Sequence, residues 1–233
     1  MIQPSNIPFE NKLLAFRALK EGLRYRYENW RMWLNYMVVA MDVGELQEAC
    51  RALNRIVEQT SEKVGAASVD EDVVDRLVDA VTRAPTGPAA ETGVEEQNPN
   101  EGMGLFKPVS NLLERTILPR VSTPRVFRAY GRLLSWQGKW EEAIKAYLDW
   151  YRSSTADTVG RGELSVEGWR AAVAEVEDIV DILINFGPKA EGYKWRLQAK
   201  SILRTFMGRT KDFEDEPEWE KLKGLQDELK TAD

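Results

Sequence analysis

Apolar residues recur at intervals of three and four along most of the chain, which is the period of an α-helix with one buried face. The clearest stripe runs from Trp169 through Val176 to Leu183. We find no segment with the strict apolar and polar alternation that is typical of a strand. The pattern predicts an all-α fold with helices near residues 10–26, 29–42, 45–60, 69–83, 108–121, 124–136, 139–153, 165–186, 189–207 and 216–230.

Residues with special backbone preferences mark the expected helix ends. Ser68 stands three residues before Glu71, which is the spacing of a capping box. Thr123 can cap a helix that begins with the proline after it. Gly187 is expected to end a helix in the left-handed conformation, and Pro188 cannot continue the hydrogen-bond ladder.

Residues 84–107 interrupt the helical pattern with prolines, glycines and glutamates. Such a composition cannot bury enough apolar surface to offset the entropy lost on ordering. We therefore expect a flexible loop inserted between two helices, and a shorter flexible stretch at 153–163. A loop of this length can be functional, and its role stays open.

Two segments of the chain share the same spacing of glycine and alanine. In "DVGELQEACRALNRIV" Gly44 precedes Ala49 by five residues, and in "WQGKWEEAIKAYLDWY" Gly138 precedes Ala143 by five. Together with Trp33, this spacing fits the 34-residue tetratricopeptide repeat, which is a helix–turn–helix unit. In that unit the glycine permits the tight turn and the alanine allows the two helices to approach closely.

The same phase extends upstream and assigns a role to the first helix. Ala15 lies one 34-residue period before Ala49, so 10–26 resembles the second helix of a repeat whose first helix is missing. Phe16 and Leu19 would then lack a neighbour. The two full copies lie 94 residues apart, from Ala49 to Ala143. Because 94 is not a multiple of 34, helices 69–83 and 108–121 are expected to form an irregular pair between them.

These patterns predict tetratricopeptide-repeat-like helical hairpins stacked as a short α-solenoid, with extra C-terminal helices. The repeats should occupy residues 10–153, interrupted by the loop at 84–107. Residues 165–233 should form a C-terminal helical extension packed on the repeats, and whether it continues or caps them stays open.

The composition excludes most kinds of catalytic and metal site. The chain has no His and a single Cys, which excludes imidazole catalysis, His-containing zinc sites, intrachain disulfides and multi-thiolate metal sites. We interpret Cys50 as a small packing residue. No phosphate loop or nucleophile motif occurs, so we expect a non-enzymatic protein without cofactors or metals. A pair of acidic side chains is the enzymatic alternative that one sequence leaves open.

The start of the chain, "MIQPSNIPFENK", has no apolar signal core, and no run approaches ~18 apolar residues. The low use of cysteine fits a reducing compartment. We expect an intracellular protein of the cytoplasm, with the nucleus as a second compartment, and no membrane partner.

The leading functional hypothesis is a protein-binding scaffold, because the first helices of stacked hairpins line a common surface. Three arginines on 124–136 share one helical face, and arginine presents a planar fork that suits carboxylates. The corresponding face of 29–42 is mostly apolar. The expected partner is an acidic-hydrophobic protein segment. The candidate residues are Arg31, Leu34, Val38, Arg125, Arg128 and Arg132.

These arginines also have an interpretation without a partner protein. They can be solvated or paired with neighbouring acidic side chains.

A known binding motif of such repeats is absent. Some tetratricopeptide domains hold the C-terminal carboxylate of Hsp90 with a clamp of Lys and Asn, whereas here Leu34, Val38, Arg128 and Arg132 occupy the expected positions.

An RNA-binding helical module is the alternative function. The segment 189–211 is basic and contains Trp195, which could stack on a base. The net charge of −6 and the acidic block "DFEDEPEWE" that follows count against nucleic acid. The interpretation that we prefer is two solvated helix faces of opposite sign. The alternative basic face comprises Lys194, Arg196, Lys200 and Arg204.

Residues 15–58 contain the sequence segments "AFRAL", "NWRMWLNY" and "DVGELQEA". These segments resemble the C-terminal repeats of the tetratricopeptide repeat protein 27 family. "VVDRLVDAV", a spacer and "LLERTILPRVSTPRVFRAYGRLL" are similar to the family's next portion, so the resemblance covers roughly 12–150. The proline-rich loop departs from the family pattern. The resemblance implies a non-enzymatic, co-chaperone-type helper in assembling large complexes. It also implies links to Hsp90 networks, to U5 small nuclear ribonucleoprotein maturation and, in fungi, to cell-wall maintenance. Because family members are considerably longer, it implies upstream repeats of a longer parent chain.

Overall fold

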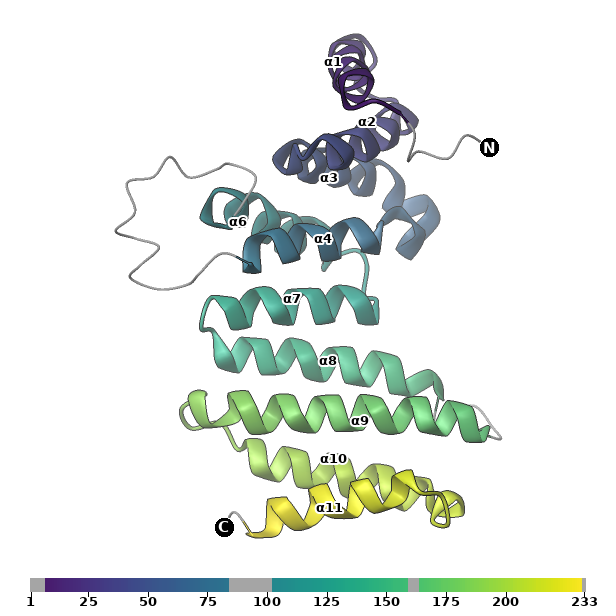
Figure 1. Ribbon diagram of the computed structural model, residues 1–233, viewed down its shortest axis with the longest axis vertical. Helices are drawn as coiled ribbons and strands as arrows, with labels where there is room; N and C mark the ends of the chain where they lie inside the picture. The colour runs from purple at the N-terminus through teal and green to yellow at the C-terminus, as the bar shows by residue number, and fades with distance from the viewer. Residues whose placement is uncertain (1–6, 84–101, 159–163, 232–233) are drawn as a thin grey trace. The chain divides into compact units, whose positions relative to one another are not determined.

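The described residues form helices, most of which are joined by short turns (Figure 1). The computed structural model describes residues 7–83, 102–158 and 164–231, and no strand occurs in these three ranges. The predicted all-α fold class is therefore confirmed. The chain divides into two compact units, Met1–Ser122 and Thr123–Asp233. The hairpin at 124–158 thus shares a unit with the C-terminal helices.

The first unit contains a hairpin with one helix packed on each side of it. Helix α1 packs on α2, α2 pairs with α3, and α3 contacts α6 and η3. Helix α4 pairs with α6. The helices of the first unit are α1 (Phe9–Tyr25), α2 (Trp30–Val43), α3 (Leu46–Val64), η2 (Gly65–Ser68), α4 (Glu71–Thr82), α6 (Gly102–Asn111) and η3 (Leu112–Ile117).

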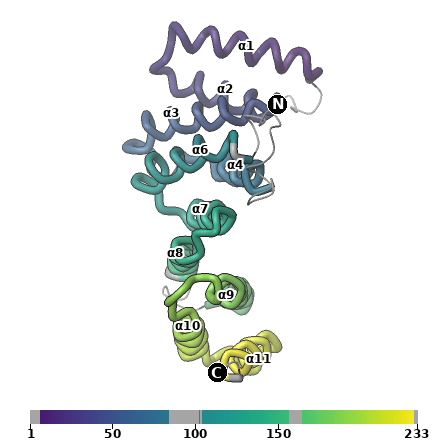
Figure 2. Tube along the Cα trace, turned by 90° about the vertical axis from the view of Figure 1, so that its left-hand side faces the viewer, coloured from purple at the N-terminus to yellow at the C-terminus, as the bar shows by residue number. Residues whose placement is uncertain are grey.

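The second unit is a two-layered stack. Seen from the side, α7, α9 and α11 lie along one flank, and α8 and α10 lie along the other (Figure 2). Each helix packs on the next one in the chain. The helices are α7 (Pro124–Trp136), α8 (Trp140–Thr158), α9 (Val166–Phe186), η4 (Gly187–Lys189), α10 (Trp195–Arg209), η5 (Lys211–Phe213) and α11 (Glu218–Thr231).

Gly44 ends α2 in the left-handed conformation, with φ of 81°. Its N–H donates to the Met41 carbonyl at 3.4 Å, and the N–H of Glu45 donates to the Ala40 carbonyl at 2.9 Å. This pair of bonds is a Schellman motif, which satisfies carbonyls that the helix end would otherwise leave unpaired. The turn directs α3 back along α2, as the repeat spacing predicts.

Gly138 ends α7 in the same way, with φ of 76°. Its N–H donates to the Ser135 carbonyl at 3.0 Å, and the N–H of Lys139 donates to the Leu134 carbonyl at 3.1 Å. The two hairpins therefore share a turn geometry bond for bond. This identity supports the repeat interpretation independently of the aromatic residues.

Small residues allow the paired helices to approach closely. Ala49 and Ala143 are both fully buried. In the second hairpin Gly131 on α7 faces the ring of Tyr147 on α8, and a Cβ atom at Gly131 would lie 2.9 Å from the Tyr147 ring. Since Cβ atoms essentially never approach so closely, any larger residue at 131 would displace the ring.

Helix α1 corrects one expectation. Phe16 does have a neighbour, because it is buried and its ring stacks on Tyr36 of α2 at 5.1 Å. The face of α1 that lacks a neighbour among the described residues instead carries Leu14, Ala15 and Ala18, which are exposed. Ala15 is thus open at the position where its counterpart Ala49 is fully buried.

Helix α6 begins at Gly102, and not at 108 as expected. The reason is that Leu105 and Val109 are buried and extend the apolar face of Leu112 and Leu113 toward the N-terminus by about two turns. The predicted flexible loop therefore overlaps a helix at 102–107. The rest of that prediction falls on 84–101, outside the described residues.

Helix ends account for the other differences. Helix α8 continues to Thr158, so helix replaces the start of the flexible stretch expected at 153–163; residues 159–163 lie outside the described ranges. Asp70 caps α4 by accepting from the Val73 N–H at 3.2 Å, whereas the Ser68 hydroxyl donates to the Gly65 carbonyl. The predicted Ser68 capping box is therefore wrong. Thr123 precedes α7, with Pro124 in the first turn, but its side chain makes no capping bond.

The turn after α9 also differs from its prediction. Gly187 is right-handed, with φ of −54°, so it is not there to permit a left-handed end. A Cβ atom at Gly187 would lie 2.1 Å from Cγ of Trp195. Glycine is required because the indole of Trp195 packs directly on the backbone. The η4 turn that follows delays the start of α10 from the predicted 189 to Trp195.

Replacement of Ala143 by Leu should destabilise the second unit by about 1–3 kcal/mol, because the added carbons overpack a closed interface. The control is Ala174→Leu, since Ala174 is exposed on α9, and it should change the free energy of unfolding by less than about 0.5 kcal/mol. Urea denaturation measures both. Equal midpoints for the two variants would show that α7 and α8 are not closely packed at residue 143.

Candidate functional site

An apolar stripe lies exposed along α2. Trp30, Leu34 and Val38 are spaced by four residues, and their exposed fractions are 41%, 36% and 50%. Residues at this spacing lie one above another on a helix, so they form one continuous strip, here named the α2 stripe. Sequence reasoning found Leu34 and Val38 but missed Trp30, although the spacing of four upstream of Leu34 indicates it.

The buried side of α2 explains why the stripe faces outward. The indole N–H of Trp33 donates to the Tyr27 carbonyl at 2.7 Å. The Trp33 ring meets Tyr27 and Tyr36 edge to face, with centroids 5.4 and 6.0 Å apart. Since Trp33, Tyr36 and Met37 are all buried, the rotation of α2 is set, and Leu34 and Val38 point the other way.

One cation stands at the N-terminal end of the α2 stripe. The exposed Arg31 guanidinium lies 5.4 Å from the centroid of the Trp30 ring. The Asn29 side chain caps the helix at this end by accepting from the Arg31 and Met32 N–H groups. The predicted trio of Arg31, Leu34 and Val38 is thus brought together on one helix, as an apolar strip with a positive end.

The three arginines of α7 lie in a different setting. Arg128 forms an ion pair with Asp178 of α9 at 2.9 Å, and its guanidinium lies 4.8 Å from the centroid of the Trp150 ring on α8. Arg125 and Arg132 also have interaction partners within the described chain. For Arg128 the alternative interpretation, pairing with an acidic neighbour, is therefore what the structure shows.

The basic face of α10 is divided between two hollows. Lys194, Arg196 and Lys200 line one of about 460 Å³, together with Tyr193, Trp195 and Leu197. Arg204 lines another, between α10 and α11. Because Trp195 is packed against the backbone of Gly187, only part of its ring is available to stack on a base.

Two carboxylates of the acidic block pair with α9. Arg170 of α9 contacts Glu216 at 2.9 Å and Glu218 at 3.3 Å. The raised pKa of Arg170 follows first from its hydrogen bond with Glu216 and then from the charge of Glu218. This pairing holds the start of α11 against α9, so these two carboxylates have a structural role.

Two titratable groups of the first unit with shifted pKa values, Cys50 and Glu48, have structural roles as well. Burial raises the pKa of the Cys50 thiol to about 12, which agrees with its interpretation as a packing residue. Burial alone would raise the pKa of Glu48, but the hydrogen bond from Lys20 and the charge of Arg51 outweigh it and lower the pKa. Glu48 therefore stays ionised and ties α1 to α3 through Lys20, at 2.8 Å.

The described residues lack the features of two other kinds of site. Among those residues, no group of three or more His, Cys, Asp or Glu side chains is placed to hold a metal ion. No described helix combines the length and the apolar character that crossing a membrane requires.

Arg128→Glu should lower the free energy of unfolding by about 1 kcal/mol, because it faces Asp178 with a like charge and removes the cation from Trp150. The effect stays small since both partners are about half exposed to solvent, at 50% and 49%. Asp178→Arg in the same chain should restore part of the loss. Urea denaturation of the four chains of this double-mutant cycle measures the coupling, and strictly additive effects would contradict the ion pair.

The chain is similar to proteins that carry tetratricopeptide repeats. It is 27% identical over 224 residues to a TPR repeat-containing protein of Schizosaccharomyces pombe, covering 93% of this chain and 26% of the relative. It is 24% identical over 222 residues to the "essential for maintenance of the cell wall protein 1" of Saccharomyces cerevisiae, covering 89% and 23%. It is 30% identical over 125 residues to the tetratricopeptide repeat-containing protein trd-1 of Caenorhabditis elegans, covering 51% and 15%.

The chain therefore spans about a quarter or less of the length of these relatives. No family model matches it, and no solved structure matches it. The similarity agrees with the two hairpins and their shared Schellman turns, and it supports a tetratricopeptide-type helical repeat.

Proposed function

We propose that this chain is a non-enzymatic, protein-binding part of a helical-repeat scaffold, and that the α2 stripe is its contact surface. The observation that carries the proposal is the exposure of Trp30, Leu34 and Val38 on one helical face. Single exposed apolar residues are ordinary, whereas a contiguous strip marks an interaction site. Similarity to tetratricopeptide proteins supports the same role.

The chemistry of the stripe suggests the kind of segment that it binds. Three apolar side chains at one spacing fit the apolar face of a partner helix. Arg31 adds a fork for a carboxylate at one end. The proposed partner is thus an acidic-hydrophobic segment, with its acidic residue near the N-terminus of α2.

We also propose an intramolecular partner for α1, in the form of a preceding helix of a longer parent chain. The support is the face of Leu14, Ala15 and Ala18, where Leu14 has an exposed fraction of 62%. Ala15 lies one 34-residue period before Ala49, which is fully buried in a hairpin whose two helices pack on each other. A helix ahead of α1 would close Ala15 in the same manner.

The assembly role follows from similarity alone and extends the proposal. The resemblance to the tetratricopeptide repeat protein 27 family supports a co-chaperone-type adaptor that works near Hsp90 and in U5 small nuclear ribonucleoprotein maturation. The name of the Saccharomyces cerevisiae relative supports a link to the cell wall. A scaffold that contacts several partners along its repeats is compatible with each of these roles.

Leu34→Glu with Val38→Glu should abolish partner binding and leave the melting temperature nearly unchanged, because both side chains are exposed. The matched control is Val64→Glu, at the end of α3, since Val64 is an apolar residue of similar exposure, 51% against 50% for Val38. Affinity purification with quantitative mass spectrometry compares the retained proteins. The proposal requires a set that Val64→Glu keeps and the double variant loses, and identical sets would refute it.

Ala15→Leu should change the free energy of unfolding of the 233-residue chain by less than about 0.5 kcal/mol, whereas Ala49→Leu should cost about 1–3 kcal/mol. In the proposed longer chain, Ala15→Leu should become as costly as Ala49→Leu. Denaturation of the four variants distinguishes the cases. A neutral Ala15→Leu in the longer chain would mean that no helix packs on this face.

A further inference from the structure

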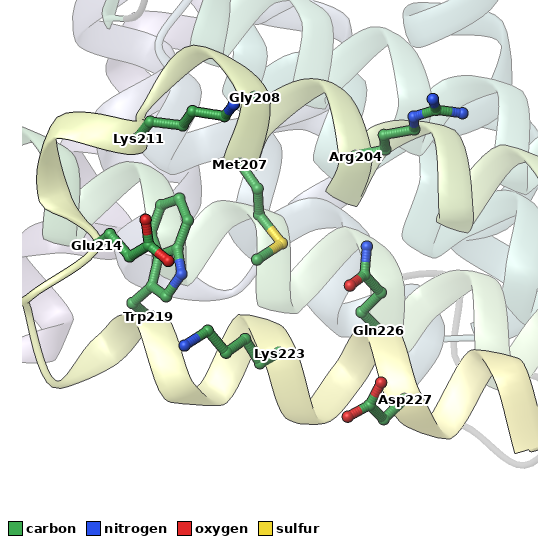
Figure 3. A pocket seen from close by; sticks show the side chains of 9 residues that line it. All are labelled: Arg204, Met207, Gly208, Lys211, Glu214, Trp219, Lys223, Gln226 and Asp227. Atoms are coloured by element: carbon green, nitrogen blue, oxygen red, sulfur yellow. The ribbon is translucent and has the colours of Figure 1, made fainter.

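A cavity of about 580 Å³ lies between α10 and α11 in the second unit. Figure 3 shows Met207 and Trp219 between the two helices, with Lys211 and Glu214 toward one end and Arg204 and Gln226 toward the other. The volume falls within the usual range of ligand pockets, about 300–1,000 Å³. The lining residues are Arg204, Met207, Gly208, Lys211, Glu214, Trp219, Lys223, Gln226 and Asp227.

The apolar part of the cavity combines a rigid residue with an adaptable one. Trp219 is buried, and its ring stacks on Trp169 with centroids 6.4 Å apart and planes 22° apart. Trp169 is stacked in turn on Phe213 at 5.1 Å. Met207 is only partly buried, and its flexible thioether can adjust to the shape of an apolar ligand group.

The charged part of the cavity has an excess of cations without partners. Lys223 is engaged by Glu220 and Asp227 by Lys230, each at 2.8 Å. Arg204 and Lys211 form no ion pair with any described residue. Among the lining carboxylates, Glu214 also forms no ion pair with a described residue. The lining therefore offers two open cations against one open carboxylate.

Gly208 lines the cavity and has open space in front of it. It lies within α10, its φ is not left-handed, and a Cβ atom there would meet nothing within 4 Å. Glycine is the least favourable residue inside a helix apart from proline. Since no contact within the described chain requires glycine at 208, the space in front of it is available to another molecule.

We propose that this cavity binds a short acidic segment of a partner protein, with one large apolar side chain against the partly buried Met207 and with carboxylates at Arg204 and Lys211. Arginine and lysine supply the charge complementarity, and the Gln226 amide is placed to bond to a peptide backbone. This site is separate from the α2 stripe, and its test does not depend on that surface.

The structure favours a peptide over RNA at this position. Base stacking needs an open aromatic face, and Trp219 is buried against Trp169.

The test is fluorescence anisotropy with the full 233-residue chain and a labelled six-residue peptide that has a central phenylalanine flanked by acidic residues. Gly208→Leu fills the cavity and should weaken binding at least about tenfold. The matched control is Gly224→Leu, because a Cβ atom at Gly224 also meets nothing within 4 Å and Gly224 does not line the cavity. This control should bind within about twofold of the unchanged chain.

Charge reversal provides a second arm. Arg204→Glu with Lys211→Glu should weaken binding at least about tenfold, whereas Lys221→Glu, on the exposed side of α11 and outside the cavity, should have little effect. Four results would overturn the proposal: no binding at about 1 mM protein, equal loss in both glycine variants, equal binding of the same peptide with alanine for phenylalanine, or tighter binding of a labelled oligouridine.

Discussion

The close approach of two helices within each hairpin is the constraint on which the other features depend. It needs a residue without a long side chain at the crossing, and Ala49 and Ala143 provide it by being fully buried. It also needs a sharp reversal, which Gly44 and Gly138 permit through positive φ angles of 81° and 76°. Once these are in place, the rotation of each helix about its axis is fixed, because dense packing tolerates little adjustment.

The exposed surfaces follow from that rotation. Burial of Trp33 and Met37 against the hairpin leaves Leu34 and Val38 outside. The same logic applies to α1, where burial of Phe16 against Tyr36 leaves Ala15 outside. A repeat that buries one face of each helix on its partner always leaves the opposite faces to neighbouring repeats or to ligands. The candidate surfaces of the first unit are therefore consequences of its internal packing.

Local features of the fold could be predicted from the sequence, and features set by distant partners could not. The helical period and the two Schellman glycines act within a few residues, so pattern alone locates the helices and turns. Gly187 is different. The sequence suggests a left-handed cap there, but the glycine is required by Trp195, which reaches its backbone only after the chain turns through η4. Likewise, the start of α6 depends on the burial of Leu105.

The candidate sites divide in the same way. Leu34 and Val38 could be found because their exposure follows from the phase of one helix. The state of Arg128 could not, because its partners Asp178 and Trp150 come from two other helices. The cavity between α10 and α11 was also beyond a pattern search, since its lining joins Arg204 and Lys211 to Trp219 across a turn. Helical periodicity places a charge on a face, and only tertiary packing decides whether that charge is already neutralised or remains open to a partner.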